Sequence, residues 1–175
     1  MHAGRRSTIL AVAILLASSL LGPAAAHDHR PPRLLLEHQD QRQLGVNYHG
    51  WWTTRSGDAC VGWDAVGPRS FPESAVREPD PKGAIRLVKR QKPAEVFLKA
   101  WQTVGVDGQP LGPATLVETD VRRIRGGRTR QWGVVFDPPF VGDNYLELFV
   151  EWEDSQRCGG AQGGYWGFHL FSESL

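Results

Sequence analysis

Cysteine is scarce in this sequence of 175 residues, which contains only Cys60 and Cys158. Neither lies in a C-x-x-C pair, so redox catalysis and zinc ribbons are not indicated. Enzyme motifs are also missing: there is no G-x-S-x-G, H-E-x-x-H or phosphate-loop pattern. The histidines are scattered along the chain. We therefore expect no catalytic activity.

No apolar run in the sequence is long enough to cross a membrane. The longest, residues 9–21, is shorter than the roughly 20 residues that a spanning helix needs. Arg5 and Arg6 precede this run, and Ala24–Ala26 follows it with small residues suited to cleavage. This order is typical of a signal peptide over residues 1–26 and predicts a secreted, extracellular protein without a transmembrane segment.

An excess of charge of one sign is missing as well. The chain has 20 basic and 19 acidic residues, a net charge of +1 with histidine neutral. The predicted leader holds two of the basic residues and no acidic one, so the remainder carries a net charge of −1. A near-neutral domain has no overall field that would attract nucleic acid or an anionic membrane, and we expect neither as a partner.

What the sequence does contain is the alternation of β-strands, most clearly between residues 145 and 152. One face would carry Leu146, Leu148, Val150 and Trp152, and the other Tyr145, Glu147, Phe149 and Glu151. Only the strand period of two sorts these residues in this way. Eight or nine such segments, separated by proline- and glycine-rich turns, predict an all-β sandwich over residues 44–175 behind a flexible arm over 27–43.

The turn Gly142-Asp143-Asn144-Tyr145 resembles the approach to strand F of immunoglobulin-like domains. In that family a tyrosine ties the preceding corner to the backbone. The resemblance implies an immunoglobulin-like antiparallel β-sandwich. Antibody domains have a cysteine two positions after this tyrosine, where the present chain has Glu147, so an antibody-type bridge is not expected.

Two cysteines in an exported chain favour one disulfide, Cys60–Cys158. It would close a loop of about 100 residues, for which chain entropy gives roughly 4–5 kcal/mol of stabilisation.

Tryptophan is abundant, with seven residues. Trp51 and Trp52 are adjacent, so in a strand they point to opposite faces and one of them is exposed or covered by a loop. An exposed tryptophan offers a surface on which sugar rings stack. The structural alternative is that Trp51, Trp63 and Trp166 pack against the disulfide.

A group of arginines surrounds the predicted turn Gly126-Gly127. Its members are Arg122, Arg123, Arg125, Arg128 and Arg130. Alternation sets Arg123 and Arg125 on one face and Arg122 on the other. The guanidinium groups match phosphate or sulfate groups of an anionic polymer, or else keep a sheet edge soluble.

Cleavage after Ala26 would expose His27-Asp28-His29 as the new N-terminus. The amine, two amides and the His29 ring form a square-planar copper site, and chelation by His27 through its own amine and ring resembles the copper site of lytic polysaccharide monooxygenases. The alternative is a polar terminus without a ligand.

These observations predict a secreted, non-catalytic binding or structural module that acts at the cell surface or in the medium. The candidate binding residues are Trp51, Trp52, Arg123, Arg125 and Arg128, with an anionic or glycan surface polymer or another protein as partner. The alternative is a copper-binding protein that uses His27 and His29. The oligomeric state stays open.

Overall fold

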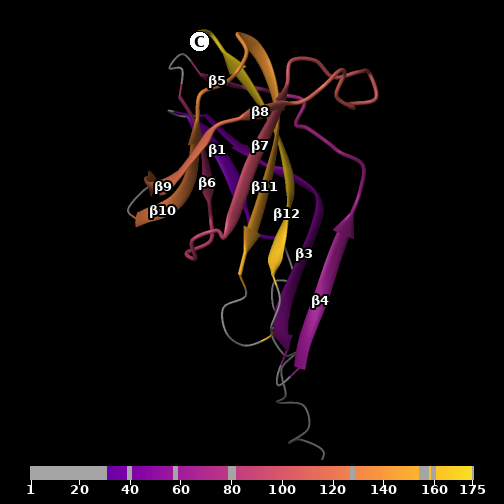
Figure 1. Ribbon diagram of the computed structural model, residues 1–175, viewed down its shortest axis with the longest axis vertical. Coiled ribbons are helices and arrows are strands. Elements are labelled where there is room, and N and C mark those ends of the chain that lie inside the picture. Colours follow the sequence, from indigo (N-terminus) through magenta and orange to yellow (C-terminus); the bar gives the residue numbers. More distant parts are fainter. Residues whose placement is uncertain are drawn as a thin grey trace, which may run out of the picture.

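The computed structural model describes residues 31–38, 41–56, 59–78, 82–126, 129–153, 158 and 161–174 (Figure 1). These residues form twelve strands and no helix, and hence no helix suited to spanning a membrane. The predicted signal peptide and the candidate copper ligands His27 and His29 lie outside the described residues.

The strands follow one another along the chain as short extended segments. They are β1 (Leu34–His38), β2 (Gln41–Leu44), β3 (Val46–Ser56), β4 (Ala59–Val66), β5 (Val76–Glu78), β6 (Gly83–Leu87), β7 (Glu95–Trp101), β8 (Thr115–Val117), β9 (Thr119–Gly126), β10 (Thr129–Phe136), β11 (Gly142–Trp152) and β12 (Gln162–Ser172).

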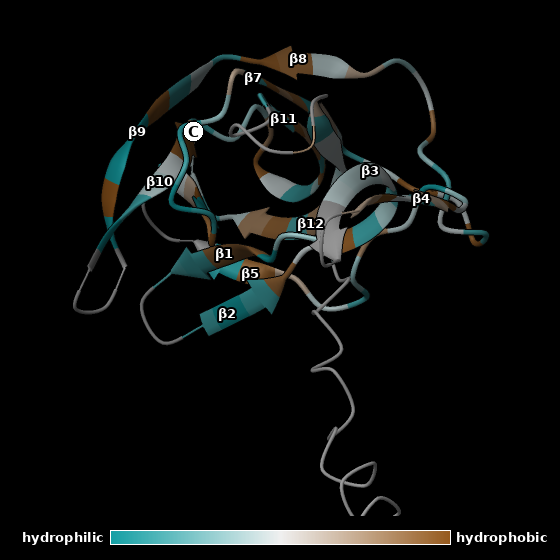
Figure 2. Cartoon of the chain, turned by 90° about the horizontal axis from the view of Figure 1, so that it is seen from below, coloured by the Kyte–Doolittle hydropathy of each residue, from teal (hydrophilic) through white to brown (hydrophobic). Residues whose placement is uncertain are grey.

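Two sheets pack against each other, which confirms the predicted β-sandwich (Figures 1 and 2). One sheet has the order β2-β1-β6-β10-β9 and the other β4-β3-β12-β11-β7-β8. The named strands pair antiparallel except β5, which runs parallel to the end of β12. The β3–β4 hairpin lies on the opposite side of the molecule from β9 and β10 (Figure 1).

The core lies between the sheets and is built by alternating side chains. The predicted inner face of β11 is confirmed, because Leu146, Leu148, Val150 and Trp152 are all 0% exposed. Trp166 on the neighbouring β12 meets Trp152 edge-on, with 6.2 Å between the ring centroids. Burial of these large apolar side chains is the main source of the sandwich's stability.

The structure differs from the predicted flexible arm over residues 27–43. Residues 34–38 form β1 and residues 41–44 form β2, and both Leu34 and Leu36 are fully buried. Their spacing of two places both leucines on the core face of a strand. The sandwich therefore begins at least ten residues before the predicted boundary at residue 44.

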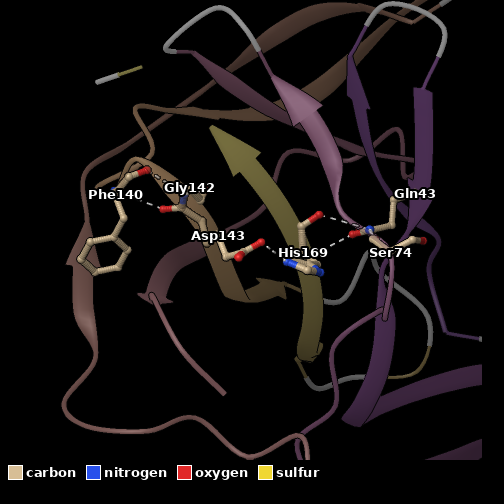
Figure 3. Close-up of polar contacts among 7 residues, drawn as sticks. Gln43, Ser74, Phe140, Gly142, Asp143 and His169 are labelled. Carbon is tan, nitrogen blue, oxygen red and sulfur yellow. Dashed lines mark hydrogen bonds and ion pairs between the residues drawn. The ribbon is translucent and has the colours of Figure 1, made fainter. Parts of the chain in front are cut away.

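Asn144 ties the corner before β11, at which Phe140 and Gly142 are labelled in Figure 3. Its side-chain amide donates to the carbonyls of Phe140, at 2.8 Å, and Gly142, at 3.0 Å, and its oxygen accepts from the Phe140 N–H at 3.2 Å. Tyr145, to which the resemblance gave this role, instead stacks on the His169 ring with 4.3 Å between centroids. The corner is therefore closed by an amide, not by a phenol.

Gln43 joins the two sheets at one edge (Figure 3). Its side chain donates to the carbonyl of His169 at 3.2 Å and accepts from the His169 N–H at 2.8 Å, while a third bond reaches the carbonyl of Ser74. Asp143 holds the His169 ring at 2.9 Å. These hydrogen bonds hold β2 of one sheet to β12 of the other.

The predicted disulfide is confirmed: Cys60 and Cys158 are bridged with an S–S distance of 2.06 Å. It joins the start of β4 to the segment between β11 and β12. Such a bond persists in oxidising compartments, which fits an extracellular protein.

Candidate binding face

The outer face of the seven-stranded sheet carries aromatic side chains that the strand register aligns. Across β7, β11, β12 and β3, one row reads Phe97, Phe149, Tyr165 and His49. The next row, extended to β4, reads Glu95, Glu151, Gly163, Trp51 and Asp64. Residues opposite each other in antiparallel strands share a face, so these rows form one surface.

Five aromatic rings on this surface form a connected group. Phe97 stacks on Phe149 with 4.5 Å between centroids, and Tyr165 lies 4.9 Å from Phe149. His49 lies 5.8 Å from Tyr165, and Trp51 lies 6.0 Å from Phe149. All except Phe149 keep part of their surface in solvent. We call these five residues the open aromatic face.

Glycine in β12 makes room for Trp51. A Cβ atom at Gly163 would lie 3.1 Å from Cζ2 of Trp51 and 2.7 Å from the carbonyl oxygen of Val150. The indole therefore lies close over the backbone at Gly163, and a side chain there would push it away. Trp51 is partly exposed, so its indole contacts both the sheet and solvent.

Carboxylates line the open aromatic face. Glu95 and Glu151 lie directly opposite each other on β7 and β11, and Asp64 lies opposite Trp51 on β4. Like charges in directly opposed positions reduce the stability of a sheet. The pair therefore gives this end of the open aromatic face a local negative charge at some cost to the sheet.

A buried ionic group separates this surface from the rest of the sheet. The carboxylate of Glu147, only 2% exposed, accepts from Nε of Arg69 at 2.5 Å and from the Tyr48 hydroxyl, and lies 3.7 Å from Nζ of Lys99. Burial, followed by the hydrogen bond and charge of Glu147, raises the pKa of Tyr48 far above its ordinary value. Tyr48 is an extra residue of β3 at the irregular pairing with Tyr165.

The segment between β4 and β5 covers the other half of the outer face. Phe71 packs edge-on against Trp101 and Tyr145, with centroid distances of 6.2 and 5.6 Å. The backbone of Ser70 lies directly over Gly167, where a Cβ atom would meet the Ser70 oxygen at 1.9 Å. We call this region the covered half, and the open aromatic face is what the segment leaves uncovered.

The tryptophans that were predicted to bind a ligand or to pack on the disulfide lie in different parts of the structure. Trp51 belongs to the open aromatic face, whereas Trp52 points to the opposite side of β3, where it is paired with Trp63 of β4. Trp63 is 39% exposed and Trp166 is in the core. Trp51 and Trp52 thus do not share a site, and the three tryptophans expected around the disulfide do not form one cluster.

The arginines lie on β9 and β10, in the other sheet. Arg122 forms an ion pair with Asp120 at 3.3 Å. The guanidinium of Arg123 lies 4.3 Å from the centroid of the Trp132 ring and donates to the carbonyl of Arg130 at 3.3 Å. Arg125 is exposed, and Arg128 lies outside the described residues. This group is separate from the open aromatic face.

Comparison of the chain with protein-family models, curated proteins and solved structures finds no match. Within the described ranges, no cluster of three or more histidine, cysteine, aspartate or glutamate side chains is placed to hold a metal ion. The copper site of His27 and His29 falls outside those ranges and stays a prediction, as does the immunoglobulin-like relationship.

Sequence reasoning found Trp51 but missed its four aromatic neighbours. Phe149 was assigned to the outer side of its strand, and Phe97 and Tyr165 occupy equivalent positions of β7 and β12. The signal was an aromatic residue on the outer side of three strands. These aromatic residues come together on one surface only because the strand register places them opposite one another.

Proposed function

We propose that this protein is an exported, non-catalytic module that binds a glycan on its open aromatic face. The observation that carries the proposal is the grouping of five aromatic rings, from four strands, on one solvent-facing surface of the sheet. Sugar rings present apolar C–H faces, and aromatic side chains provide large rigid contact areas for them.

The carboxylates supply the polar part of the same recognition. Glu95, Glu151 and Asp64 form a row beside the rings. Carboxylate oxygens accept hydrogen bonds from sugar hydroxyls, or from the ammonium group of an amino sugar. Binding of either kind relieves the unfavourable opposition of Glu95 and Glu151 by placing donors between them.

The shape of the site favours a polymer segment over a small enclosed ligand. The rings lie on the surface of a sheet and span the width of four strands, about 15 Å at the usual strand spacing. That width accommodates two or three consecutive sugar rings. The arginines of β9 and β10 lie on the other sheet and do not contribute to this surface.

The first experiment is titration calorimetry with soluble neutral and amino-sugar oligosaccharides. Replacement Trp51→Ala is expected to weaken binding by about fivefold or more, since a stacked aromatic contact contributes about 1 kcal/mol. The control Arg125→Ala changes the other sheet and is expected to leave affinity unchanged. Loss of binding in Arg125→Ala with retention in Trp51→Ala would assign the site to the arginines, and a panel without any binder would overturn the proposal.

A further inference from the structure

The edge strand β4 is longer than the edges β2 and β8 and carries less charge than the equally long edge β9. β4 has eight residues and lies at the outer margin of the molecule, with β3 as its only partner in the described sheet (Figure 1). Edges β2 and β8 are shorter, with four and three residues. The edge β9 carries Asp120, Arg122, Arg123 and Arg125.

Sheet edges in soluble proteins are usually blocked by charge, proline or a bulge. β4 has no proline, a single charged residue, Asp64, and an uninterrupted register with β3. It also exposes apolar side chains, with Val66 at 80% and Trp63 at 39%. These features leave a straight backbone edge able to pair with another strand.

The direction of the backbone groups follows from the pairing with β3. The N–H of Gly67 donates to the carbonyl of Tyr48, so the backbone polar groups of Gly67 are directed toward β3. Hydrogen-bonding direction alternates along an antiparallel strand. The N–H and C=O groups of Val66, Asp64 and Gly62 therefore point away from β3, toward the margin of the sheet.

We propose that β4 pairs antiparallel with β4 of a second copy of this chain, about a twofold axis through Trp63. Gly62 of one copy then lies opposite Asp64 of its partner, and Asp64 opposite the partner's Gly62. The two tryptophans at position 63 face each other on the other side of the sheet, where aromatic pairs stabilise cross-strand contacts. In this register no two like charges lie opposite each other. If the twofold axis passed through Asp64 instead of Trp63, the two Asp64 side chains would lie opposite each other.

This dimer joins the two seven-stranded sheets into one. Because opposed residues share a face, the open aromatic faces of both copies point to the same side of the joined sheet. The assembly would bind a glycan at two places and gain avidity over one copy. The pairing itself does not depend on the proposed glycan function.

Substitutions at Gly62 test the register, because a Cβ atom at that position has no neighbour within 4 Å. Sedimentation velocity of the ligand-free protein over a range of concentrations would give the dimer dissociation constant. Gly62→Asp places an aspartate opposite Asp64 of the partner at two symmetric positions, so we expect the dimer dissociation constant to rise about tenfold. The matched Gly62→Lys places a lysine opposite the same Asp64 side chains, so the dissociation constant should fall or stay unchanged.

A monomer at every concentration up to the millimolar range would overturn the proposal. So would a dimer that responds equally to Gly62→Asp and Gly62→Lys, since the interface would then lie elsewhere. A direct test of the axis is Trp63→Cys, which should form a cross-linked dimer on mild oxidation, compared with Ala65→Cys, which should not. Because none of these measurements uses a ligand, their failure is separate from failure of the glycan proposal.

Discussion

The two halves of the outer face of the seven-stranded sheet contain similar residues and differ in what lies over them. In the covered half, Trp101, Tyr145 and His169 form a cross-strand row beneath Phe71. In the open half, the parallel row of Phe97, Phe149, Tyr165 and His49 has no such cover from the segment between β4 and β5. Among the described residues, the segment between β4 and β5 thus packs over one of these two aromatic rows.

Under the proposed glycan function, this difference separates residues that stabilise the fold from residues that bind the ligand. Residues of the covered half contact the covering segment, so their replacement should lower the free energy of unfolding. Apart from the buried Phe149, the rings of the open half are partly exposed to solvent, so their replacement should change binding more than stability. The predictions below test that division, beginning with the largest expected effect.

Replacement Glu147→Ala should reduce the free energy of unfolding by about 3 kcal/mol, because hydrogen bonds to charged groups are lost from Arg69 and Tyr48. Denaturant titration measures this change. The control is Glu151→Ala on the same side of β11 in the open half, where a change within about 0.5 kcal/mol is expected. Equal effects of both substitutions would contradict the division between the halves.

Replacement Gly167→Ala should cost about 2 kcal/mol, because the added methyl group overlaps the Ser70 oxygen and the segment above must lift. Thermal unfolding reports the change. Gly62→Ala is the matched control, since the Cβ atom there meets nothing within 4 Å. A stable Gly167→Ala variant would show that the covering segment is not packed on β12.

Alkaline pH should weaken the fold. All three tyrosines, Tyr48, Tyr145 and Tyr165, have a pKa above the ordinary value of 10.0, with burial as the largest cause. Their protons are kept in the folded state and released in the unfolded state as the pH rises past 10. This contribution to stability is therefore complete below pH 10 and falls above it, by up to about 1.4 kcal/mol per pH unit for the more deeply buried Tyr48 and by less for Tyr145 and Tyr165, whose charges are screened by solvent.

The variant Tyr48→Phe tests whether tyrosine ionisation causes the loss of stability at alkaline pH, because it removes the titrating hydroxyl from the buried group around Glu147. The slope of unfolding free energy against pH, between about pH 10 and 11, should be smaller in this variant than in the unchanged protein. An unchanged slope would place the alkaline sensitivity in other groups. The measurement uses urea titrations at each pH.

The sequence predicted the parts of the fold that depend on one strand at a time. The inward side of β11 followed from the spacing of Leu146, Leu148, Val150 and Trp152. The disulfide followed from two cysteines in a chain with a predicted export signal. The strand that contains Leu34 and Leu36 was instead predicted to be part of a flexible arm, because one short strand between polar residues gives little periodicity. Its place between β2 and β6 depends on partners distant along the chain.

The burial of Glu147 could not be predicted for the same reason. Its position on the outer side of β11 was correct, but Arg69 and Tyr48 come from segments 78 and 99 residues away. Charged residues on an outer strand face usually contact water. Only the tertiary structure reveals that Arg69 and Tyr48, from distant segments, cover Glu147.

The position of β12 has a consequence for the order of folding. Residues 162–172 are the last strand described along the chain, yet β12 lies between β3 and β11 in the sheet. The β3–β4 hairpin joins the remaining strands of that sheet only through β12. While synthesis proceeds from the N-terminus, β3 and β4 have no link to the rest of their sheet, so the seven-stranded sheet cannot be completed until this segment emerges. Such long-range pairing makes folding slow. We therefore expect the seven-stranded sheet to close only after nearly the whole chain has been synthesised, which leaves time for the chain to be threaded through a narrow channel before the sandwich is complete.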